Sequence, residues 1–366
     1  MQLTISRTSL LQYVQRCQSI VEKRSTKPIL CNLCLEADNQ QLTIIGTDLQ
    51  IALSATIQTH IIEPGKTTVS AQKLFEIIKE LDVDQDIELQ TEASFLVIKS
   101  GRSRFQLSIM DANEYPGMPN DDTEMGFDID AEMLAKMIQS TAFAMSNDET
   151  RKYLTGTLFE VTPTSKFRMI TTDSHRLALI ESSLDTSSTD IQCIVPRKTV
   201  LEIKKIAEEQ GGTIHLSMSK RQIRLKSGGY TLSSKIIDAI FPAYEEVIPT
   251  TNPRHVDVDN KGLDQVLRRA MIVANESTHD VRLTFEDKGL HVAAHNTDQE
   301  QAQEFIEAEM EGIETIIGFN GRYLRDVLGV ISTAQVHINF KDALSPVLLT
   351  PAGDSTAKYV VMPMRI

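Results

Sequence analysis

Serine, histidine and carboxylate side chains, the types that serine hydrolases use, stand together in the segment Thr172-Asp173-Ser174-His175-Arg176. In such enzymes they act as nucleophile, general base and orienting acid, and they normally converge from separate loops. Residues of one short turn cannot easily adopt that geometry. A β-turn in which the Asp or Ser side chain hydrogen-bonds its own backbone is the simpler interpretation. We therefore favour a structural turn and keep hydrolysis by Asp173 and His175 as a distant alternative.

Two residue pairs have the side chains of a metal site, but each pair is incomplete. Cys31 and Cys34 lie in a segment, Ile29–Leu35, that we predict to be extended, so they point to opposite faces of a strand. No second cysteine pair completes a zinc site. His291 and His295 can share one strand face, but no adjacent carboxylate accompanies them. The sequence also lacks a phosphate-binding loop, a glycine-rich dinucleotide motif, HExxH and GxSxG. We expect no catalytic residue, no metal and no cofactor.

The dipeptide Thr-Asp recurs at a constant interval along the chain. It occurs at Thr47-Asp48, Thr172-Asp173 and Thr297-Asp298, with the same interval in both steps (173 − 48 = 125; 298 − 173 = 125). A further Thr189-Asp190 is off this register, so the spacing carries the prediction. Such an interval is about the length of one domain. The sequence therefore predicts three copies of one structural unit.

Two amphipathic helices are predicted in each copy, one before and one after the Thr-Asp dipeptide. Their apolar residues follow the spacing of one buried helix face. In the first helices these residues are Leu10, Leu11, Val14, Cys17 and Val21; Met133, Leu134, Met137, Ile138 and Thr141; and Leu263, Val266, Leu267, Ala270 and Met271. In the second helices they are Leu74, Phe75, Ile77, Ile78 and Leu81; Val200, Leu201 and Ile203; and Leu324, Val327, Leu328 and Ile331. Ser70 and Asn320 stand at N-cap positions, and Pro196 opens the middle helix.

Short β segments between and after the helices include Leu42–Ile45, Phe167–Ile170, Ile223–Leu225 and Val347–Leu349. Several strands follow one another directly, so we expect an α+β fold of largely antiparallel sheets with the helices on one face. An acidic stretch near Asn120–Glu124 and a Pro/Thr/Asn linker near Pro249–Pro253 predict domains 1–122, 123–249 and 250–366. A single α/β domain is the alternative, but it would not place the same pattern at constant spacing.

Composition sets further bounds on the class of protein. The chain has 366 residues, 41% of them hydrophobic, no Trp and a formal net charge of −13. This content suits three modest cores better than one large core. No segment approaches the roughly 18 apolar residues that a membrane helix needs, and no N-terminal signal pattern is present. Four cysteines are too few for a disulfide framework. We expect a soluble, cytoplasmic protein with no membrane partner.

Several motifs resemble those of one known family. They are Gly46-Thr47-Asp48-Leu49, Ser100-Gly101-Arg102-Ser103-Arg104-Phe105, Thr172-Asp173-Ser174-His175-Arg176-Leu177-Ala178, Val195-Pro196-Arg197-Lys198 and Tyr359-Val360-Val361-Met362-Pro363-Met364-Arg365. Over its whole length, the chain resembles the bacterial DNA polymerase III beta subunits, the replicative DNA sliding clamps. The resemblance implies a head-to-tail homodimeric ring of six similar clamp-fold domains, with helices lining a central hole. It also implies a non-enzymatic processivity factor that encircles duplex DNA and tethers the polymerase.

The same resemblance implies a dimer interface in which a basic strand of one chain meets an acidic segment of the other. The residues carried over are Lys73, Leu74, Arg102, Arg104, Phe105 and Leu107 in the first domain, and Ile272, Val273, Asp298, Glu300 and Glu304 in the third. Complementary rim charges should set register more than affinity. A heterologous contact of this kind closes when two chains supply six domains. A solvated charge run is the alternative interpretation.

The net charge of −13 at first argues against a DNA partner, because proteins that grip the duplex neutralise phosphates with clustered Lys and Arg. A ring holds DNA by topology, so we expect only modest basic character on the helices that face the hole. Candidates are Arg16, Lys136, Lys198, Lys204, Lys205, Arg268, Arg269, Arg322 and Arg325. The family positions for DNA contact are Arg24, Lys152, Tyr153 and Lys198. Position 152 is aromatic in the best-known members, so a phosphate contact would replace a stacking contact. A solvated helix face is the competing interpretation for each lysine, and no helix shows a base-reading cluster.

The family docks short peptides in an apolar cleft between its second and third domains. The positions carried over are Leu154, Thr172, His175, Arg176, Leu177, Pro242, Val247, Ser345, Val360, Met362, Pro363 and Met364, with Gly156 nearby. Met and Val suit a site that admits several related peptides. The implied partners are the DNA polymerase III catalytic subunit, the clamp loader and other proteins with clamp-binding peptides. A C-terminal strand packed in the core and a monomeric peptide-binding scaffold are the alternatives. Ser174 stands where Gly is common and Glu246 where Arg is usual, which leaves the peptide preference of the rim open.

Overall fold

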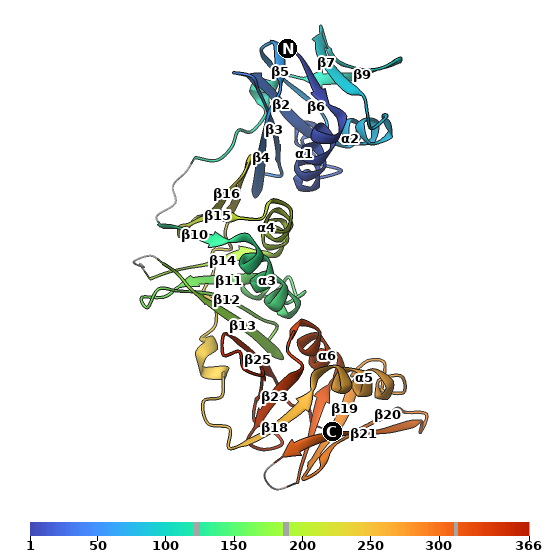
Figure 1. Cartoon of the computed structure of the whole chain (residues 1–366), viewed down its shortest axis with the longest axis vertical. Coiled ribbons are helices and arrows are strands. Elements are labelled where there is room, and N and C mark those ends of the chain that lie inside the picture. The colour runs from blue at the N-terminus through green and yellow to red at the C-terminus, as the bar shows by residue number, and fades with distance from the viewer. Residues whose placement is uncertain (121–124, 186–189, 311–313, 366) are drawn as a thin grey trace. The chain divides into compact units, whose positions relative to one another are not determined.

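The computed structural model describes every residue except 121–124, 186–189, 311–313 and 366. The described residues form two compact units, one of Met1–Ala131 with Lys205–Ile236 and one of Glu132–Lys204 with Ile237–Ile366. Figure 1 labels the α-helices and most of the strands of both units. All the strand pairings in the described chain are antiparallel, so the predicted α+β class is confirmed. The predicted boundary at Asn120–Glu124 and the off-register Thr189 fall mostly outside the described residues.

The first unit contains a 13-stranded sheet in the order β10-β15-β16-β17-β4-β3-β2-β6-β9-β8-β7-β1-β5. The strands are β1 (Gln2–Ser6), β2 (Asn32–Asp38), β3 (Gln41–Thr47), β4 (Ile51–Gln58), β5 (His60–Glu63), β6 (Gly65–Ser70), β7 (Asp86–Glu92), β8 (Phe95–Ser100), β9 (Ser103–Met110), β10 (Met125–Asp130), β15 (Thr213–Met218), β16 (Gln222–Ser227) and β17 (Tyr230–Lys235). The pairing of β17 with β4 joins distant parts of the sequence in one sheet.

Helices α1 (Arg7–Ile20) and α2 (Ala71–Glu80) lie side by side in the first unit, where α1 also packs on β3 and β4 (Figure 1). Ser70 accepts a hydrogen bond from the backbone N–H of Lys73, so the predicted cap is confirmed. The buried positions of the two helices are Leu10, Val14, Cys17 and Ile20, and Ala71, Leu74 and Ile78. The helix faces predicted from the apolar periodicity thus contain most of these buried positions, which face the sheet.

The second unit contains a 12-stranded sheet in the order β14-β11-β12-β13-β25-β24-β23-β18-β21-β20-β19-β22. The strands are β11 (Gly156–Val161), β12 (Lys166–Thr172), β13 (Arg176–Ser183), β14 (Ile191–Pro196), β18 (Arg254–Asp259), β19 (Asp280–Glu286), β20 (Gly289–His295), β21 (Gln301–Met310), β22 (Thr315–Asn320), β23 (Gln335–Phe340), β24 (Val347–Pro351) and β25 (Ala357–Val361). The remaining helices are α3 (Ala131–Thr141), α4 (Arg197–Gln210), α5 (Asn260–Ala270) and α6 (Gly321–Val330), of which α4 belongs to the first unit from Lys205 onward. Asn320 caps α6 by accepting hydrogen bonds from two backbone N–H groups, as predicted.

Two local predictions are wrong. Pro28–Cys31 forms a 3₁₀ helix, so the strand predicted from Ile29 begins only at Asn32. The proline at the start of that turn fixes its φ angle in the helical range. Pro196 is the last residue of β14, and α4 begins at Arg197.

The Thr-Asp dipeptides of the first two copies, Thr47-Asp48 and Thr172-Asp173, form the same turn. In both, the aspartate Oδ1 accepts hydrogen bonds from the backbone N–H groups two and three positions later. In both, the threonine hydroxyl donates to the carbonyl oxygen four positions later. Leu49 and Ser174 follow the aspartates with φ angles of 73° and 76°. The predicted turn, with an aspartate bonding its own backbone, is confirmed.

The third copy departs from this pattern. Asn296, not Asp298, takes the role of the turn-forming side chain, because its Oδ1 accepts hydrogen bonds from the backbone N–H groups of Asp298 and Glu300. The left-handed residue is Gln299, with φ 65°. The turn between β20 and β21 is longer than its two counterparts. The equal spacing of Thr297-Asp298 therefore does not mark an equivalent position, although the repeated helix and strand pattern remains.

Candidate functional site

An apolar cluster lies in the second unit where β13 pairs with β25. Leu177 stands opposite Val360 in this pairing, and Leu348 on β24 stands opposite Val360 on its other side. Directly opposite residues share one sheet face, so these three contribute to one surface. The buried members of this cluster, the β13–β25 cluster, are Leu158, Ile170, Leu177, Leu179, Ile194, Tyr244 and Val360. Partly buried side chains that pack against it are Tyr153, Ile237, Phe241, Ile248 and Leu348.

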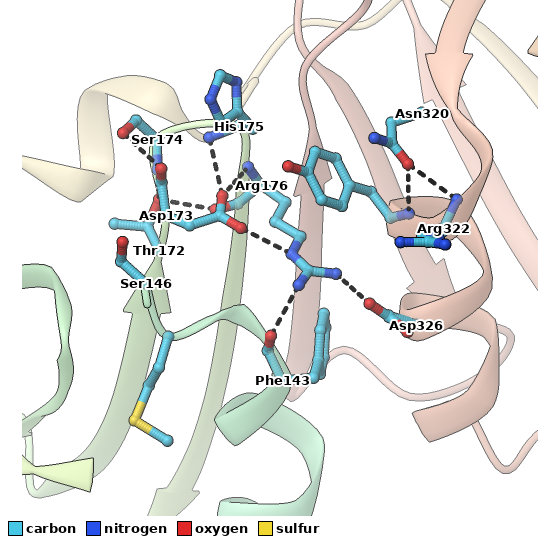
Figure 2. Close-up of polar contacts among 12 residues, drawn as sticks. Phe143, Ser146, Thr172, Asp173, Ser174, His175, Arg176, Asn320, Arg322 and Asp326 are labelled. Carbon is cyan, nitrogen blue, oxygen red and sulfur yellow. Dashed lines mark hydrogen bonds and ion pairs between the residues drawn. The ribbon is translucent and has the colours of Figure 1, made fainter. Parts of the chain in front are cut away.

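The Thr172-Asp173 turn at the start of β13 carries Arg176, whose side chain is only 10% exposed. Its Nε donates to Asp173 Oδ2 at 3.0 Å, one terminal nitrogen donates to the carbonyl oxygen of Phe143 at 2.9 Å, and the other pairs with Asp326 of α6 (Figure 2). The guanidinium carbon lies 4.5 Å from the centroid of the Tyr323 ring and 5.2 Å from that of Phe143. Arg176 thus joins the turn, the segment after α3 and helix α6.

The serine, histidine and aspartate side chains of this turn do not form a catalytic relay. Asp173 Oδ1 accepts a hydrogen bond from the backbone N–H of His175, whose ring points away from the carboxylate (Figure 2). That ring stacks on Tyr323, with 6.1 Å between the centroids and 22° between the planes. Ser174 Oγ donates to the Asp173 carbonyl oxygen. The geometry therefore gives no support to the hydrolase alternative.

The segment after β25 lies beside this turn. The backbone N–H of Met362 donates to the carbonyl oxygen of His175 at 2.8 Å, and that of Met364 donates to Gly318 of β22 at 2.8 Å. Val360 is fully buried, whereas both methionine side chains remain half-buried. The interpretation as a packed core strand thus holds for Val360 and Val361, the last residues of β25, but not for Met362 and Met364.

A short 3₁₀ helix, η5 (Tyr244–Val247), contributes to the same cluster through Tyr244. The Tyr244 hydroxyl donates to Glu160 Oε2 at 2.6 Å and accepts from Arg168 at 3.2 Å. Burial, and then the hydrogen bond to Glu160, raise the pKa of the Tyr244 hydroxyl well above its ordinary range. The tyrosine is therefore neutral and fixed, while Val247 at the end of η5 is 40% exposed.

The structure brings together the predicted cleft residues that come from β13, β25 and the adjoining turn: Thr172, His175, Arg176, Leu177, Val360 and Met362. Leu154 is buried at the end of η4 (Lys152–Leu154), Pro242 is exposed, and Ser345 Oγ donates to Asp342 at 2.9 Å. Pro363 is half-buried, and Gly156 allows β11 to approach β14, since a Cβ there would lie 2.4 Å from the Val195 carbonyl oxygen. For both groups of residues, membership of a peptide-binding cleft stays a prediction.

Sequence reasoning missed Phe143, Tyr323 and Asp326 as partners of Arg176. The last two lie on a helix whose buried face was predicted from its apolar residues. Their i, i+3 spacing places them on one side of α6, but no pattern in the sequence indicates which arginine they meet.

Two strands have one unpaired edge over part of their length. From Ser103 to Ser108, β9 pairs only with β8 among the described residues, and β6 joins it at Ile109. From Gln301 to Glu307, β21 likewise pairs only with β20 in the described part of the chain, before it turns to β18. Unpaired edges offer free backbone N–H and C=O groups to another strand.

The predicted interface residues lie on and near these two edges. On the first, Arg102 and Arg104 are exposed, and Phe105 is 38% exposed. Leu74 and Leu107 are buried and Lys73 is exposed. On the second, Ile272 is 79% exposed and Val273 half-buried, while Asp298 and Glu300 are exposed. Glu304 forms a two-hydrogen-bond pair with Arg269 of the same chain, at 2.8 and 2.7 Å, so its charge already has a partner.

The cations proposed for DNA contact differ in their surroundings. Arg24, Lys152 and Lys198 are exposed, whereas Tyr153 is half-buried against the β13–β25 cluster. Several helix candidates are paired with carboxylates: Arg16 with Glu209, Arg269 with Glu304, and Arg325 with Asp264. Lys136, Arg268 and Arg322 are exposed, and Lys204 and Lys205 are half-buried. Paired arginines have less charge to offer phosphates.

Within the described ranges, no group of three or more His, Cys, Asp or Glu side chains is arranged to hold a metal ion. Cys34 is buried, which raises the pKa of its thiol to about 11, and Cys31 is half-buried. In the part of the chain that the structure describes, no helix has the length and apolar character to span a membrane.

Matches to known proteins extend over essentially the whole chain. The models of the N-terminal, central and C-terminal domains of the DNA polymerase III beta subunit match residues 1–119, 128–243 and 245–365. The beta sliding clamp of Pseudomonas putida is 38% identical over 368 residues, with 100% of each chain covered.

Solved structures agree with this assignment. The crystal structure of the DNA polymerase III subunit beta from Pseudomonas aeruginosa matches with a TM-score of 0.97 and 38% identity, over 100% of both chains. That of the same organism's sliding clamp bound to griselimycin gives the same TM-score, identity and coverage. The resemblance inferred from the sequence motifs is thereby confirmed. This chain belongs to the DNA polymerase III beta subunit family.

Proposed function

We propose that the chain acts as a DNA sliding clamp, a cytoplasmic processivity factor that encircles duplex DNA and has no catalytic activity of its own. The observation that carries this proposal is the full-length match to proteins and structures named as sliding clamps. The repeated α+β unit supports it, because an encircling protein needs repeated domains more than a single active site. The separation of His175 from the Asp173 carboxylate also favours a non-enzymatic role.

The proposal includes a homodimeric ring of chains with three domains each, 1–122, 123–249 and 250–366. The half-open edges of β9 and β21 support a head-to-tail contact, since antiparallel edge strands of two copies can extend one sheet. The two edges differ in sequence, so the contact is heterologous and closes only when the ends of an assembly meet. Arg102 and Arg104 on one edge complement the acidic Asp298 and Glu300 beside the other.

In this proposal DNA is held by enclosure and not by sequence. A net charge of −13 suits a protein that must not grip phosphates along its whole surface. Exposed Arg24, Lys152 and Lys198 supply local attraction, and half-buried Tyr153 contributes little beyond its packing. Sliding then requires that each contact be weak.

The β13–β25 cluster is the proposed docking site for short peptides of the polymerase catalytic subunit, the clamp loader and other DNA-processing proteins. Its supporting features are the partly buried Tyr153, Phe241 and Leu348 around a buried centre, and the half-buried methionines after β25. Methionine side chains adapt to different partners at low cost. The fixed Tyr244 and Arg176 give the rim a rigid frame.

Retention on DNA tests enclosure directly. The clamp is loaded on nicked circular DNA with the loader of the same source, and its dissociation is followed before and after the DNA is cut once. Enclosure predicts long retention on the circle and rapid loss from the linear form, with little effect of moderate salt on the circle. Equal dissociation from both forms would contradict the proposal, because a surface-bound protein does not respond to free ends.

A further inference from the structure

The first unit has its own version of the strand junction that forms the β13–β25 cluster. There β4 pairs with β17, with Ala52 opposite Ser233, beside the Thr47-Asp48 turn. Its turn has the same hydrogen bonds as the Thr172-Asp173 turn. Nothing in the proposed function uses this junction.

A cavity of about 250 Å³ opens at this junction. Its lining residues include Leu49, Ile51, Pro116, Pro119, Arg221 and Lys235. The apolar lining residues are Leu49, Ile51, Ala52 and the two prolines. None of the lining residues is acidic.

The backbone holds Leu49 in place at the cavity. Its φ of 73° is one that branched side chains rarely adopt, and the turn hydrogen bonds of Thr47 and Asp48 impose it. Leu49 remains 42% exposed. Because these hydrogen bonds are made within the turn, they hold the Leu49 side chain at the cavity before any ligand binds.

The opposite wall is also fixed. Gln222 Nε2 donates to the carbonyl oxygen of Asn120 at 2.9 Å, and a terminal nitrogen of Arg224 donates to that of Pro119 at 2.6 Å. These bonds hold the segment Pro116–Pro119 against β16. The cavity is therefore preformed, which lowers the entropic cost of filling it.

Its charge indicates what could fill it. Arg221 and Lys235 are both exposed at the cavity, and neither forms an ion pair with the part of the chain that the structure describes. Two such cations in a chain of net charge −13 create a local positive site next to apolar walls. A ligand that complements both features has an apolar side chain next to a carboxylate.

We propose that this cavity is a second docking site, which takes a short acidic peptide segment of a partner protein. An apolar side chain of the peptide packs on Leu49 and the prolines, and a carboxylate pairs with Arg221 and Lys235. The site differs from the β13–β25 cluster in its occupant, because Ser233 and Arg224 replace the apolar Val360 and Leu348 at equivalent strand positions.

Methyl NMR on the full-length chain tests the proposal with a defined probe, the peptide acetyl-Leu-Glu-Leu-Glu. Signals of Leu49 and Ile51 report on the cavity, and signals of Leu177 and Val360 report on the β13–β25 cluster. The acidic peptide should shift the cavity signals saturably. The neutral peptide acetyl-Leu-Gln-Leu-Gln should bind about fivefold more weakly, as loss of an exposed charge pair implies.

Variants separate the contributions of charge and apolar contact. Arg221→Glu should weaken binding of the acidic probe about fivefold or more. Lys226→Glu, a charge reversal near the far end of β16 at a residue that does not line the cavity, should leave binding unchanged. Leu49→Gly removes the apolar contact while relieving the backbone, because glycine adopts positive φ freely; Ile51 then serves as reporter, and its shift should be lost.

The results have distinct meanings for the two sites. Shifts confined to Leu177 and Val360 would overturn the second site while leaving the proposed peptide cleft intact. Equal binding of both peptides, or equal effects of Arg221→Glu and Lys226→Glu, would also overturn it. Shifts of Leu49 that respond to Arg221→Glu would support it even if polymerase peptides failed to bind the β13–β25 cluster.

Discussion

The two strand junctions, β13 with β25 and β4 with β17, share a backbone framework but differ in their side chains. The first places Leu177, Val360 and Leu348 at corresponding positions, and the second places Ala52, Ser233 and Arg224 there. The first therefore forms a broad apolar surface. At the second, Ser233 Oγ donates to Gln222 and Arg224 binds the Pro119 carbonyl oxygen. Repetition of a backbone thus does not repeat a binding site, because side-chain volume and polarity decide what each junction can bind.

Leu177→Ala places at the apolar junction the residue type that Ala52 supplies at the polar one. We expect the largest loss of stability from this change. Leu177 is 2% exposed, so truncation should lower the free energy of opening of β13 and β25 by about 2–5 kcal/mol and weaken peptide binding as well. Native-state hydrogen exchange of the β13 amides measures the first effect. Leu344→Ala, at a residue 64% exposed, should leave exchange unchanged. An equal effect of both changes would show that the cluster is not a tightly packed core.

Arg176→Met tests the guanidinium contacts of the Thr172-Asp173 turn, which the equivalent turn at Thr47-Asp48 lacks because Ile51 stands at that position. The change leaves the Asp173 carboxylate, 14% exposed, without its guanidinium partner. We expect the free energy of unfolding to fall by about 2 kcal/mol, a figure that allows for the weaker contribution of the more exposed Asp326. Ile51 occupies the equivalent turn position in the first copy, so Ile51→Met should cost about 1 kcal/mol or less. Thermal unfolding of both variants provides the comparison. A smaller loss for Arg176→Met than for Ile51→Met would contradict the role given to the arginine.

Met364→Ala tests whether the segment after β25 belongs to the apolar junction in function. We expect polymerase-peptide affinity to fall about fivefold, by about 1 kcal/mol, as loss of partly buried apolar contact implies. Isothermal titration calorimetry measures the affinity, and sedimentation should show an unchanged assembly. Met133→Ala, at a methionine 39% exposed on α3, is the matched control. Unchanged affinity for Met364→Ala would remove this residue from the docking site.

Arg104→Glu tests the pairing of the two half-open edges. The change places a carboxylate near Glu92, which Arg104 contacts at 3.4 Å, and removes the charge complement of β21. We expect dimer dissociation to become about fivefold more favourable, the size of an exposed charge contribution. Lys66→Glu on β6, which breaks a similar exposed pair with Glu36 on β2, should leave the sedimentation profile unchanged. An unaltered mass for Arg104→Glu would argue against this edge as the interface.

Acid should lower the stability of both units, but only to a small extent. Burial opposes ionisation of Glu181 and Glu209, yet hydrogen bonds from Lys166 and Arg168, and from Gln12 and Arg16, lower the two pKa values below 4.5. A lowered folded-state pKa contributes stability above pH 4.5, and this is lost as the pH falls through the folded value. Glu181→Gln and Glu209→Gln should each flatten the pH dependence of unfolding below pH 4.5. A steeper dependence in either variant would contradict the sign.

Much of this architecture could be predicted from local patterns. The periodicity of residues such as Leu10 and Val14 identified the helices, and Ser70 and Asn320 identified two of their starts. The turn at Asp173 followed from the ability of aspartate to bond its own backbone. The longer third turn did not, because asparagine at position 296 performs the same role from a different offset.

Contacts between distant segments were not predictable in the same way. No spacing in the sequence relates Arg176 to Asp326 or to the carbonyl oxygen of Phe143. Nor does any pattern show that Pro119 is bound by Arg224 and so becomes the wall of a cavity. Such contacts depend on which strands pair, and β4 meets β17 only after the chain has folded back on itself.

The unpaired edges of β9 and β21 have a consequence for the number of chains that an assembly can contain. In the proposed head-to-tail contact every chain contributes one β9 edge and one β21 edge, so any open row of chains ends in two unpaired edges. Only a closed assembly has none, and free strands of this kind recruit stray polypeptide. In the proposed ring, closure thus covers both edges of every chain and limits their pairing with other polypeptides, whereas each opening of the ring exposes them again.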